Sequence, residues 1–260
     1  MTGVNKTLYI PLYGKALVNK KGIILKDRFA ETIWDQSGFT LKGKSASKWL
    51  AYYMGMRARV FDDWVRERIS DNKNAVVLHL GCGLDSRAQR IAAGETRWYD
   101  LDFPQVVEER HRHFEEDELY KMIGCDLRED GWLHKIGDSR DAIVIMEGVS
   151  MYLSPNELSS LISKLCGRFD RISLLMDCYT TFAARASKIK NPINDVGVTQ
   201  VYGMDDPLAL EKVGIGFFCE REMTPEPLVN ELSGMERSIF RSLYAGGISK
   251  KLYKLYEYKK

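Results

Sequence analysis

Two glycines and two acids form the first group of residues whose spacing points to chemistry. The apolar run 75–80 ends at Gly81-Cys82-Gly83, just before a predicted helix. A buried strand that ends in Gly-x-Gly lets its backbone approach a ligand closely. Asp100 and Asp102 end the next strand-like run, at about the twenty-residue spacing from which a carboxylate can reach a ribose diol. The pattern predicts a nucleotide-type pocket, although Ser86 replaces the third glycine of a dinucleotide fingerprint.

Two later strand ends carry groups of the same kind. Asp126 and Leu127 follow the run near 120–125, and Glu147 closes the run 141–147. An adenosine needs close backbone approach, an acceptor for its ribose, and a hydrogen-bond partner and an apolar face for its base. Strand-end aspartates also cap turns, so one such residue alone means little. Four such ends in order predict a site for a nucleoside-bearing cofactor.

Alternating strands and helices must position these residues. We expect strands near 75–80, 97–102, 120–125, 141–147 and 171–178, with helices near 85–93, 104–117 and 155–167. This alternation predicts an α/β fold with a Rossmann-like, mostly parallel sheet and helices on both faces. A strand near 215–222, a helix opened by Thr224-Pro225 and a closing strand near 252–258 follow.

Residues 1–74 are predicted to form a helical cover, with the core in 75–260. A helix over 51–70 repeats apolar side chains at helical spacing, and Arg57 falls near the boundary of its apolar face. An arginine there either stays solvated or points into a pocket. The segment 186–209, rich in glycine and proline, is expected to form a lid or acceptor-site insertion.

Bulk properties narrow the functional class. The 260 residues carry 38 basic and 36 acidic side chains, a net charge of +2, with no concentrated basic block, so we expect no nucleic-acid partner. Five cysteines without a Cys-x-x-Cys pair indicate a reduced protein. No apolar run has the length of a membrane span, so we expect no membrane partner and a cytoplasmic location.

Four ordered motifs resemble those of the leucine carboxyl methyltransferase family. They are Leu80–Arg87 (LGCGLDSR), Asp100–Pro104 (DLDFP), Cys125–Glu129 (CDLRE) and Met146–Leu153 (MEGVSMYL). The chain is most similar to the bacterial branch of tetracenomycin-type polyketide O-methyltransferases. The resemblance implies a class I enzyme that uses S-adenosylmethionine, with an antiparallel terminal strand in its sheet.

The resemblance also implies roles for individual residues. Gly81, with Cys82 and Gly83, would lie under the methionine and ribose, and Asp102 would hold the ribose hydroxyls, with Asp100 a less central candidate. Asp126 and Leu127 would frame the adenine, and Glu147 would face the cofactor. Lys15 and Arg57 would grip the cofactor carboxylate, a task that suits a guanidinium.

The methyl acceptor is less clear from the sequence. A carboxylate, with a pKa near about 4, is already ionised at neutral pH, whereas a phenol near about 10 gains from a base. We find no persuasive base in the sequence. We also expect no metal, because His111 and His113 point to different sides of a helix and so make a poor metal-binding pair. Tyr13 and Tyr152 are candidates for the acceptor pocket.

Several functions remain open at this point. The first is methyl transfer to a carboxyl or hydroxyl oxygen of a small, polyketide-like molecule. The alternatives are a methyltransferase for a protein's C-terminal leucine and a module that binds S-adenosylmethionine without turnover. A nicotinamide-dependent dehydrogenase is disfavoured by the missing glycine and the later motifs. The oligomeric state cannot be predicted.

Overall fold

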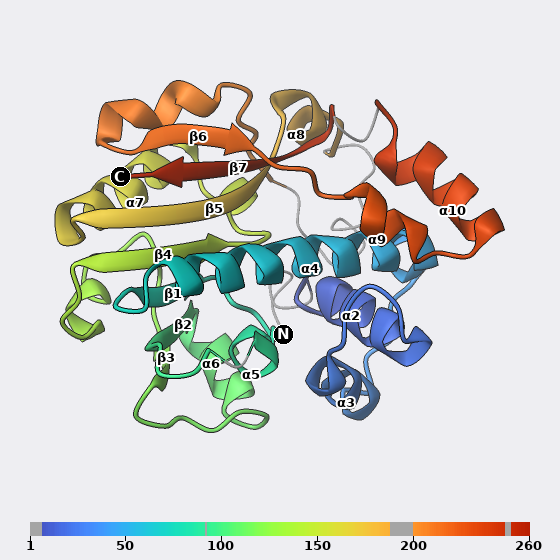
Figure 1. Cartoon of the computed structure of the whole chain (residues 1–260), viewed down its shortest axis with the longest axis horizontal. Coiled ribbons are helices and arrows are strands. Elements are labelled where there is room, and N and C mark those ends of the chain that lie inside the picture. The colour runs from blue at the N-terminus through green and yellow to red at the C-terminus, as the bar shows by residue number, and fades with distance from the viewer. Residues whose placement is uncertain (1–6, 92, 188–199, 248–250) are drawn as a thin grey trace.

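A seven-stranded sheet forms the centre of the computed structural model, which describes residues 7–91, 93–187, 200–247 and 251–260 (Figure 1). Its strands lie in the order β3-β2-β1-β4-β5-β7-β6. They are β1 (Val76–Leu80), β2 (Trp98–Asp102), β3 (Tyr120–Gly124), β4 (Asp141–Met146), β5 (Arg171–Tyr179), β6 (Gly216–Glu220) and β7 (Tyr253–Lys259). Strands β1 to β5 are parallel and β7 runs antiparallel to both its neighbours. The predicted sheet, including its antiparallel terminal strand, is confirmed.

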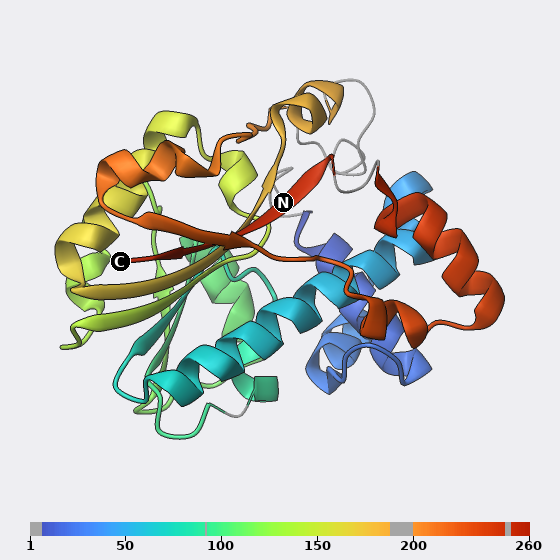
Figure 2. The same cartoon turned by 45° about the horizontal axis from the view of Figure 1, so that its top comes forward.

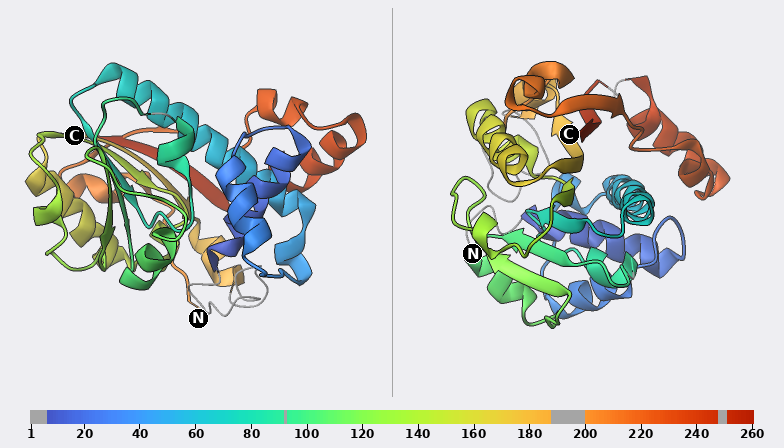
Figure 3. Two further views of the ribbon diagram at one scale, coloured as in Figure 1. Left: turned by 90° about the horizontal axis from the view of Figure 1, so that it is seen from below. Right: turned by 60° about the vertical axis from the view of Figure 1, so that its left-hand side comes forward.

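Helices cover both faces of this sheet. The elements are α2 (Tyr9–Lys21), α3 (Arg28–Gln36), α4 (Lys48–Asp71), α5 (Arg87–Ile91), α6 (Pro104–Arg110), α7 (Pro155–Arg168), α8 (Thr181–Ser187), α9 (Glu226–Asn230) and α10 (Gly234–Phe240), with short helical turns between them. Figure 3 shows α4 and α7 on opposite sides of the sheet. Alternate strand residues divide accordingly: Ile143 and Ile145 of β4 pack with the α4 side, and Ala142 and Val144 with the α7 side.

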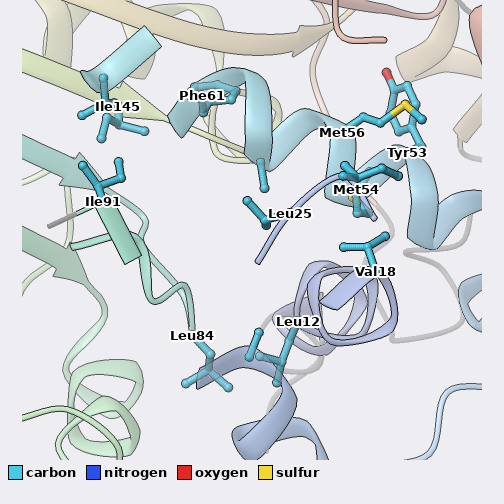
Figure 4. Close-up of a cluster of buried hydrophobic side chains, with 14 of the residues drawn as sticks. Leu12, Val18, Leu25, Tyr53, Met54, Met56, Phe61, Leu84, Ile91 and Ile145 are labelled. Carbon is cyan, nitrogen blue, oxygen red and sulfur yellow. The ribbon is translucent and has the colours of Figure 1, made fainter. Parts of the chain in front are cut away.

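The helices before β1 pack on one end of the sheet through α4. Figure 2 shows α4 running from the face of the sheet out to α2 and α3. In the close-up, Val18 of α2 lies near Met54 and Leu12 of α2 lies near Leu84, while Phe61 and Ile145 belong to the same buried cluster nearer the sheet (Figure 4). A single apolar core therefore joins the N-terminal helices to the strands, and α4 carries side chains to the strand ends.

Two helices are shorter than the sequence predicts. The helix expected over 104–117 ends at Arg110, where the chain turns and enters the acidic run 115–118. Negative side chains are unfavourable at a helix C-terminus. The Arg110 guanidinium also donates to the carbonyls of Gly83 and Asp85, which fixes this turn against the glycine loop. The helix expected over 85–93 covers only Arg87–Ile91, because a turn at Gly83 and Leu84 comes first and the helix begins after Ser86.

The order in which the chain adds strands to the sheet reverses between β1 and β4. The chain proceeds from β1 to β2 and β3 on one side, then returns to β4 and β5 on the other. Ligands of open α/β sheets bind at the carboxyl ends of strands at such a point. Much of the predicted lid near 186–209 lies outside the described residues, but Tyr202 N–H donates to Met151 O at 2.8 Å beside the strand ends. Among the described residues, no helix is both long and apolar enough to span a bilayer.

Candidate active site

A cavity of about 370 Å³ opens at the carboxyl ends of β1, β4 and β5. Its wall combines the glycine loop after β1, the loop after β4, and residues of α2, α4, α8 and β7. One part of the lining is polar, and the other is mostly aliphatic and aromatic. The polar part contains Lys15, Arg57, His79, Gly81, Cys82, Gly83, Asp85 and Glu147. Seven of the predicted site residues thus meet in one wall, the seventh being Tyr152.

The glycine loop takes a backbone form that other residues adopt with strain. Gly81 has a φ of 65° and Gly83 a φ of 54°, both in the left-handed region. A Cβ at Gly81 would lie 2.3 Å from Cγ2 of Val149. Gly81 and Cys82 donate to Leu101 O at 2.7 and 3.1 Å, which holds the loop against β2. The glycines therefore keep the backbone close to the cavity and to the β4 loop.

Lys15 and Arg57 reach the cavity from α2 and α4. Lys15 Nζ lies 3.2 Å from Asp85 Oδ1, and Arg57 donates from Nε to Glu147 at 3.0 Å. Arg57 Nη1 donates to Asp177 Oδ2 at 2.9 Å. Arg57 is thus a buried cavity residue, which excludes the solvated alternative for its side chain.

Glu147 connects two arginines at the end of β4. Its Oε1 accepts from Arg57, and its Oε2 accepts from the fully buried Arg87. Burial alone would raise the pKa of Glu147, but these two guanidinium groups lower it to about 2. Glu147 is therefore ionised at neutral pH and faces the cavity as a negative charge.

Further ion pairs bind the N-terminal helices to the glycine loop. The buried network contains five carboxylates and four basic groups, so it holds one negative charge in excess when all are ionised. Its members are Asp27, Asp62, Asp85, Glu147 and Asp177 with Lys15, Arg57, Arg87 and Arg90. A cationic ligand suits such a site better than an anionic one.

The two acids of β2 occupy different surroundings. Asp102 lies behind the glycine loop, where its carboxylate accepts from Gly83 N and Phe103 N, both at 2.8 Å. Asp100 is fully buried, accepts from Trp98 Nε1 and Tyr120 Oη, and pairs with Arg110. Neither acid is among the residues that line the cavity.

These different surroundings leave Asp102 able to bind a ligand and give Asp100 a structural role. Two bonds leave other lone pairs of the Asp102 carboxylate open to further donors, since a carboxylate offers about four acceptor sites. The Asp100 carboxylate instead holds β2, β3 and α6 together. A ribose contact therefore fits Asp102 and does not fit Asp100.

Three other predicted residues lie outside the cavity wall. Asp126 pairs with Arg128 at the end of β3, and Leu127 is buried in the core on the α7 side. Tyr13 does not point into the cavity but packs on Trp34, with ring centroids 4.9 Å apart. Because Tyr13 lies two residues from both Pro11 and Lys15, which line the cavity, it occupies the opposite face of α2.

The apolar part of the cavity is rich in tyrosine. Its described lining includes Tyr53, Tyr152, Tyr179, Tyr244 and Tyr253 together with Ile10, Leu50, Met54, Met151, Leu243 and Leu252. Tyr179 and Tyr253 meet edge to face with centroids 4.9 Å apart. Such a wall suits a flat apolar body that presents a single polar group.

Comparisons with known proteins identify the family. The family model for leucine carboxyl methyltransferases matches residues 5–166. The chain belongs to the leucine carboxyl methyltransferase family. It is 29% identical over 242 residues to the tetracenomycin polyketide synthesis O-methyltransferase TcmP of Streptomyces glaucescens, covering 91% of this chain and 89% of that protein. It is 26% identical to the S-adenosyl-L-methionine-dependent methyltransferase dpfgK of Gibberella zeae, covering 81% and 78%.

A solved structure supports the same fold. Magnesium protoporphyrin IX methyltransferase (ChlM) of Synechocystis, with bound SAH, superposes with a TM-score of 0.53 at 15% identity, over 95% of this chain and 97% of that one. Together with the family, this likeness confirms the class I methyltransferase fold. This protein is an S-adenosylmethionine-dependent methyltransferase.

The residues of the site fit this cofactor. S-adenosylmethionine combines an amino-acid zwitterion with a sulfonium and so carries one net positive charge, opposite to the excess charge of the buried network. Gly81 and Gly83 line the cavity without side chains, so a ligand can approach their backbone closely. No metal-binding group of histidine, cysteine and carboxylate side chains occurs among the described residues.

Sequence reasoning missed Tyr253, which lines the cavity, and Asp177, a buried carboxylate outside the lining that accepts hydrogen bonds from Arg57 and Tyr253. Asp177 follows Leu175 by two residues on β5, so it faces α4, as Glu147 does after Ile145 on β4. A carboxylate inside an otherwise apolar strand, two residues after an apolar residue of the same face, could have predicted that Asp177 faces α4. Tyr253 comes from the antiparallel strand β7, and no local motif marks it.

Proposed function

We propose that the chain transfers a methyl group from S-adenosylmethionine to a carboxyl or hydroxyl oxygen of a small, polyketide-like molecule. The observation that carries the proposal is the division of one cavity into a charged glycine-loop end and a tyrosine-rich apolar end. Likeness to a polyketide O-methyltransferase over 91% of the chain supports the same class of acceptor. The absence of a metal and the cytoplasmic location stay predictions from the sequence.

The cofactor would lie at the charged end. When bound, it supplies a methyl group activated by the positive sulfonium. Arg57 and Lys15 would hold its carboxylate, and Glu147 would attract its positive groups. Gly81, Cys82 and Gly83 would offer backbone close to the methionine and ribose, Asp102 would accept from the ribose hydroxyls, and Asp126 and Leu127 would frame the adenine.

The apolar end would orient the acceptor and exclude water. Aligning acceptor oxygen and methyl group in a dry pocket supplies most of what a displacement at carbon requires. Tyr152, at the end of the loop after β4, is half-buried in this wall, and burial raises its pKa, so it acts as a neutral hydrogen-bonding and packing group.

Methyl transfer from deuterium-labelled S-adenosylmethionine tests this function. We would incubate the protein with a panel of aromatic hydroxy compounds and carboxylic acids, and separately with a peptide that ends in leucine. We expect mass spectrometry to find the label in a small aromatic product, and alkaline hydrolysis to distinguish an ester from an ether. Label in the peptide alone would contradict the proposal.

A further inference from the structure

Three apolar side chains form a stripe along the exposed face of α10 and of the helical turn that follows it. Met235, Ile239 and Leu243 are 80%, 40% and 52% exposed. They stand four residues apart, a spacing that places side chains on one face of a helix. Contiguous exposed apolar side chains mark interaction sites, whereas scattered single ones need no explanation. We call these three residues the α10 stripe.

The other face of α10 already holds the helix in place. Phe240 is fully buried, and its ring centroid lies 5.6 Å from that of Tyr244 and 6.5 Å from that of Tyr52 on α4. Glu236 accepts hydrogen bonds from Tyr52 Oη and Lys48 Nζ, both at 3.0 Å. Figures 1 and 2 both show α10 beside the N-terminal end of α4. The stripe is therefore not needed to seat the helix.

The α10 stripe leads directly into the cavity. Leu243 lines the cavity although half of its surface is exposed, so it stands at the mouth. Its neighbour Tyr244 also lines the cavity, with its ring centroid 5.3 Å from that of Tyr53 in the tyrosine-rich wall. Both residues belong to η6 (Arg241–Ala245), a turn of π-helix, which is a form frequent at functional sites. The tyrosine-rich wall and the stripe thus form one continuous apolar surface.

The size of the cavity indicates what covers this surface. A pocket for one drug-sized ligand has about 300–1,000 Å³, and this cavity has about 370 Å³. The proposed function places two molecules in it, the methionine end of the cofactor at the charged wall and the acceptor at the apolar wall. An acceptor larger than the apolar end must therefore extend through the mouth past Leu243. A single row of side chains on a convex helix suits a narrow chain better than a flat ring system.

The charged side chains of α10 turn away from the stripe. Arg237 donates to Asn230 O at 2.8 Å, and Arg241 pairs with Glu226, both on α9. Glu236 bonds to the start of α4. The stripe offers no charged partner to a ligand, so it favours an uncharged tail over an ionic one.

We propose that the α10 stripe binds an elongated apolar tail of the methyl acceptor, outside the cavity. This inference rests on the proposed function and narrows its acceptor class to molecules with a reacting end and an alkyl-like extension. The reacting end lies between the tyrosines, and the tail follows Leu243, Ile239 and Met235. Eight residue steps separate the ends of the stripe, so at about 1.5 Å each it accommodates a tail of about 12 Å.

Two probe series test this site by their binding to the protein saturated with S-adenosylhomocysteine. They are 4-alkoxybenzoic acids and 4-alkoxyphenols with methoxy or octyloxy chains, so the test does not depend on which oxygen accepts the methyl group. We expect the affinity to rise about twofold for each added methylene, because burying one side of a methylene gains about half of its transfer free energy. In at least one series, the seven added methylenes should tighten binding about a hundredfold.

A double variant of exposed residues tests whether the stripe causes this gain. Met235→Ser/Ile239→Ser should lower the octyloxy-to-methoxy ratio of affinities at least about fivefold, because it removes two apolar contacts of the tail and leaves the cavity intact. For a probe that is methylated, KM should rise while kcat stays within about twofold, since the stripe does not touch the reacting atoms. Leu208→Ser is the matched control. Leu208 is 53% exposed, as much as Leu243, but lies in η5 (Pro207–Val213) outside the cavity lining.

Each result decides a different point. A wild-type ratio below about threefold in both series, or binding of no probe at millimolar concentration, overturns the tail site. A ratio that the double variant leaves unchanged, or that Leu208→Ser lowers equally, also overturns it. Light scattering of the same proteins covers the other occupant: a wild-type dimer that the double variant dissociates, with an unchanged ratio, assigns the stripe to a second copy of the chain. Failure of the wild-type protein to bind S-adenosylhomocysteine would instead contradict the proposed function.

Discussion

Gly81→Ala tests whether the backbone of the glycine loop, rather than its side chains, makes the cofactor site. An alanine at a φ of 65° costs about 1–2 kcal/mol in left-handed strain. Its Cβ would also lie 2.3 Å from Val149, and overpacking adds about 1–3 kcal/mol. We therefore expect a loss of about 2–5 kcal/mol in the free energy of unfolding. Displacement of the loop should weaken S-adenosylhomocysteine binding by at least about tenfold.

Gly22→Ala is the matched control for this variant. Gly22 has a φ of 67° at the end of α2, and a Cβ there would meet nothing within 4 Å. It should lose only the strain term, about 1–2 kcal/mol, and keep its affinity within about twofold. Urea unfolding and calorimetric titration of both variants measure the two quantities. If Gly81→Ala bound the ligand as tightly as Gly22→Ala, the close approach of the loop to the cofactor would be refuted.

Three further predictions separate binding residues from structural ones. Asp102→Asn should weaken S-adenosylhomocysteine binding at least about tenfold in calorimetry, since a ribose diol donates better to a carboxylate, and unchanged affinity would remove Asp102 from the site. Asp100→Asn should lower the free energy of unfolding by about 3 kcal/mol in urea, because it leaves buried Arg110 without its charge partner, while the folded variant keeps its affinity within about threefold. Glu147→Gln should destabilise the protein at about pH 7. The pKa of Glu147 falls from 4.5 to about 2 on folding, so the stabilisation is present above pH 4.5 and is lost as the pH falls toward 2. The difference from wild type in urea unfolding should therefore shrink at about pH 3, and a constant difference would contradict the assignment.

The fold was predictable because its signals are local and repeated. Each parallel strand is a short apolar run, and Ser154 and Glu157 form the capping box that starts α7. The ends of α5 and α6 were not predictable in the same way. Arg110 ends α6 partly through bonds to the glycine loop, which is 25 or more residues away in the chain.

The site was predictable only in part for a related reason. The glycines and the acid after β4 stand in contiguous motifs, so their meeting follows from parallel strands alone. Asp177 and Tyr253 meet because β7 inserts between β5 and β6, a pairing that neither residue's neighbours in the sequence encode. Asp100 and Asp102 could not be told apart from the sequence, because they are two aspartates in one motif. Only the contacts of Asp100 with Arg110 and Tyr120, which come from other elements, give the two carboxylates different surroundings.

Calorimetric titration of the purified protein with S-adenosylmethionine and S-adenosylhomocysteine, with NAD as the control, tests the central claim most directly. The charged glycine-loop end of the cavity predicts micromolar binding of both sulfur-containing ligands and no measurable binding of NAD. Binding of NAD, or of none of the three, would contradict the assignment of this cavity to S-adenosylmethionine.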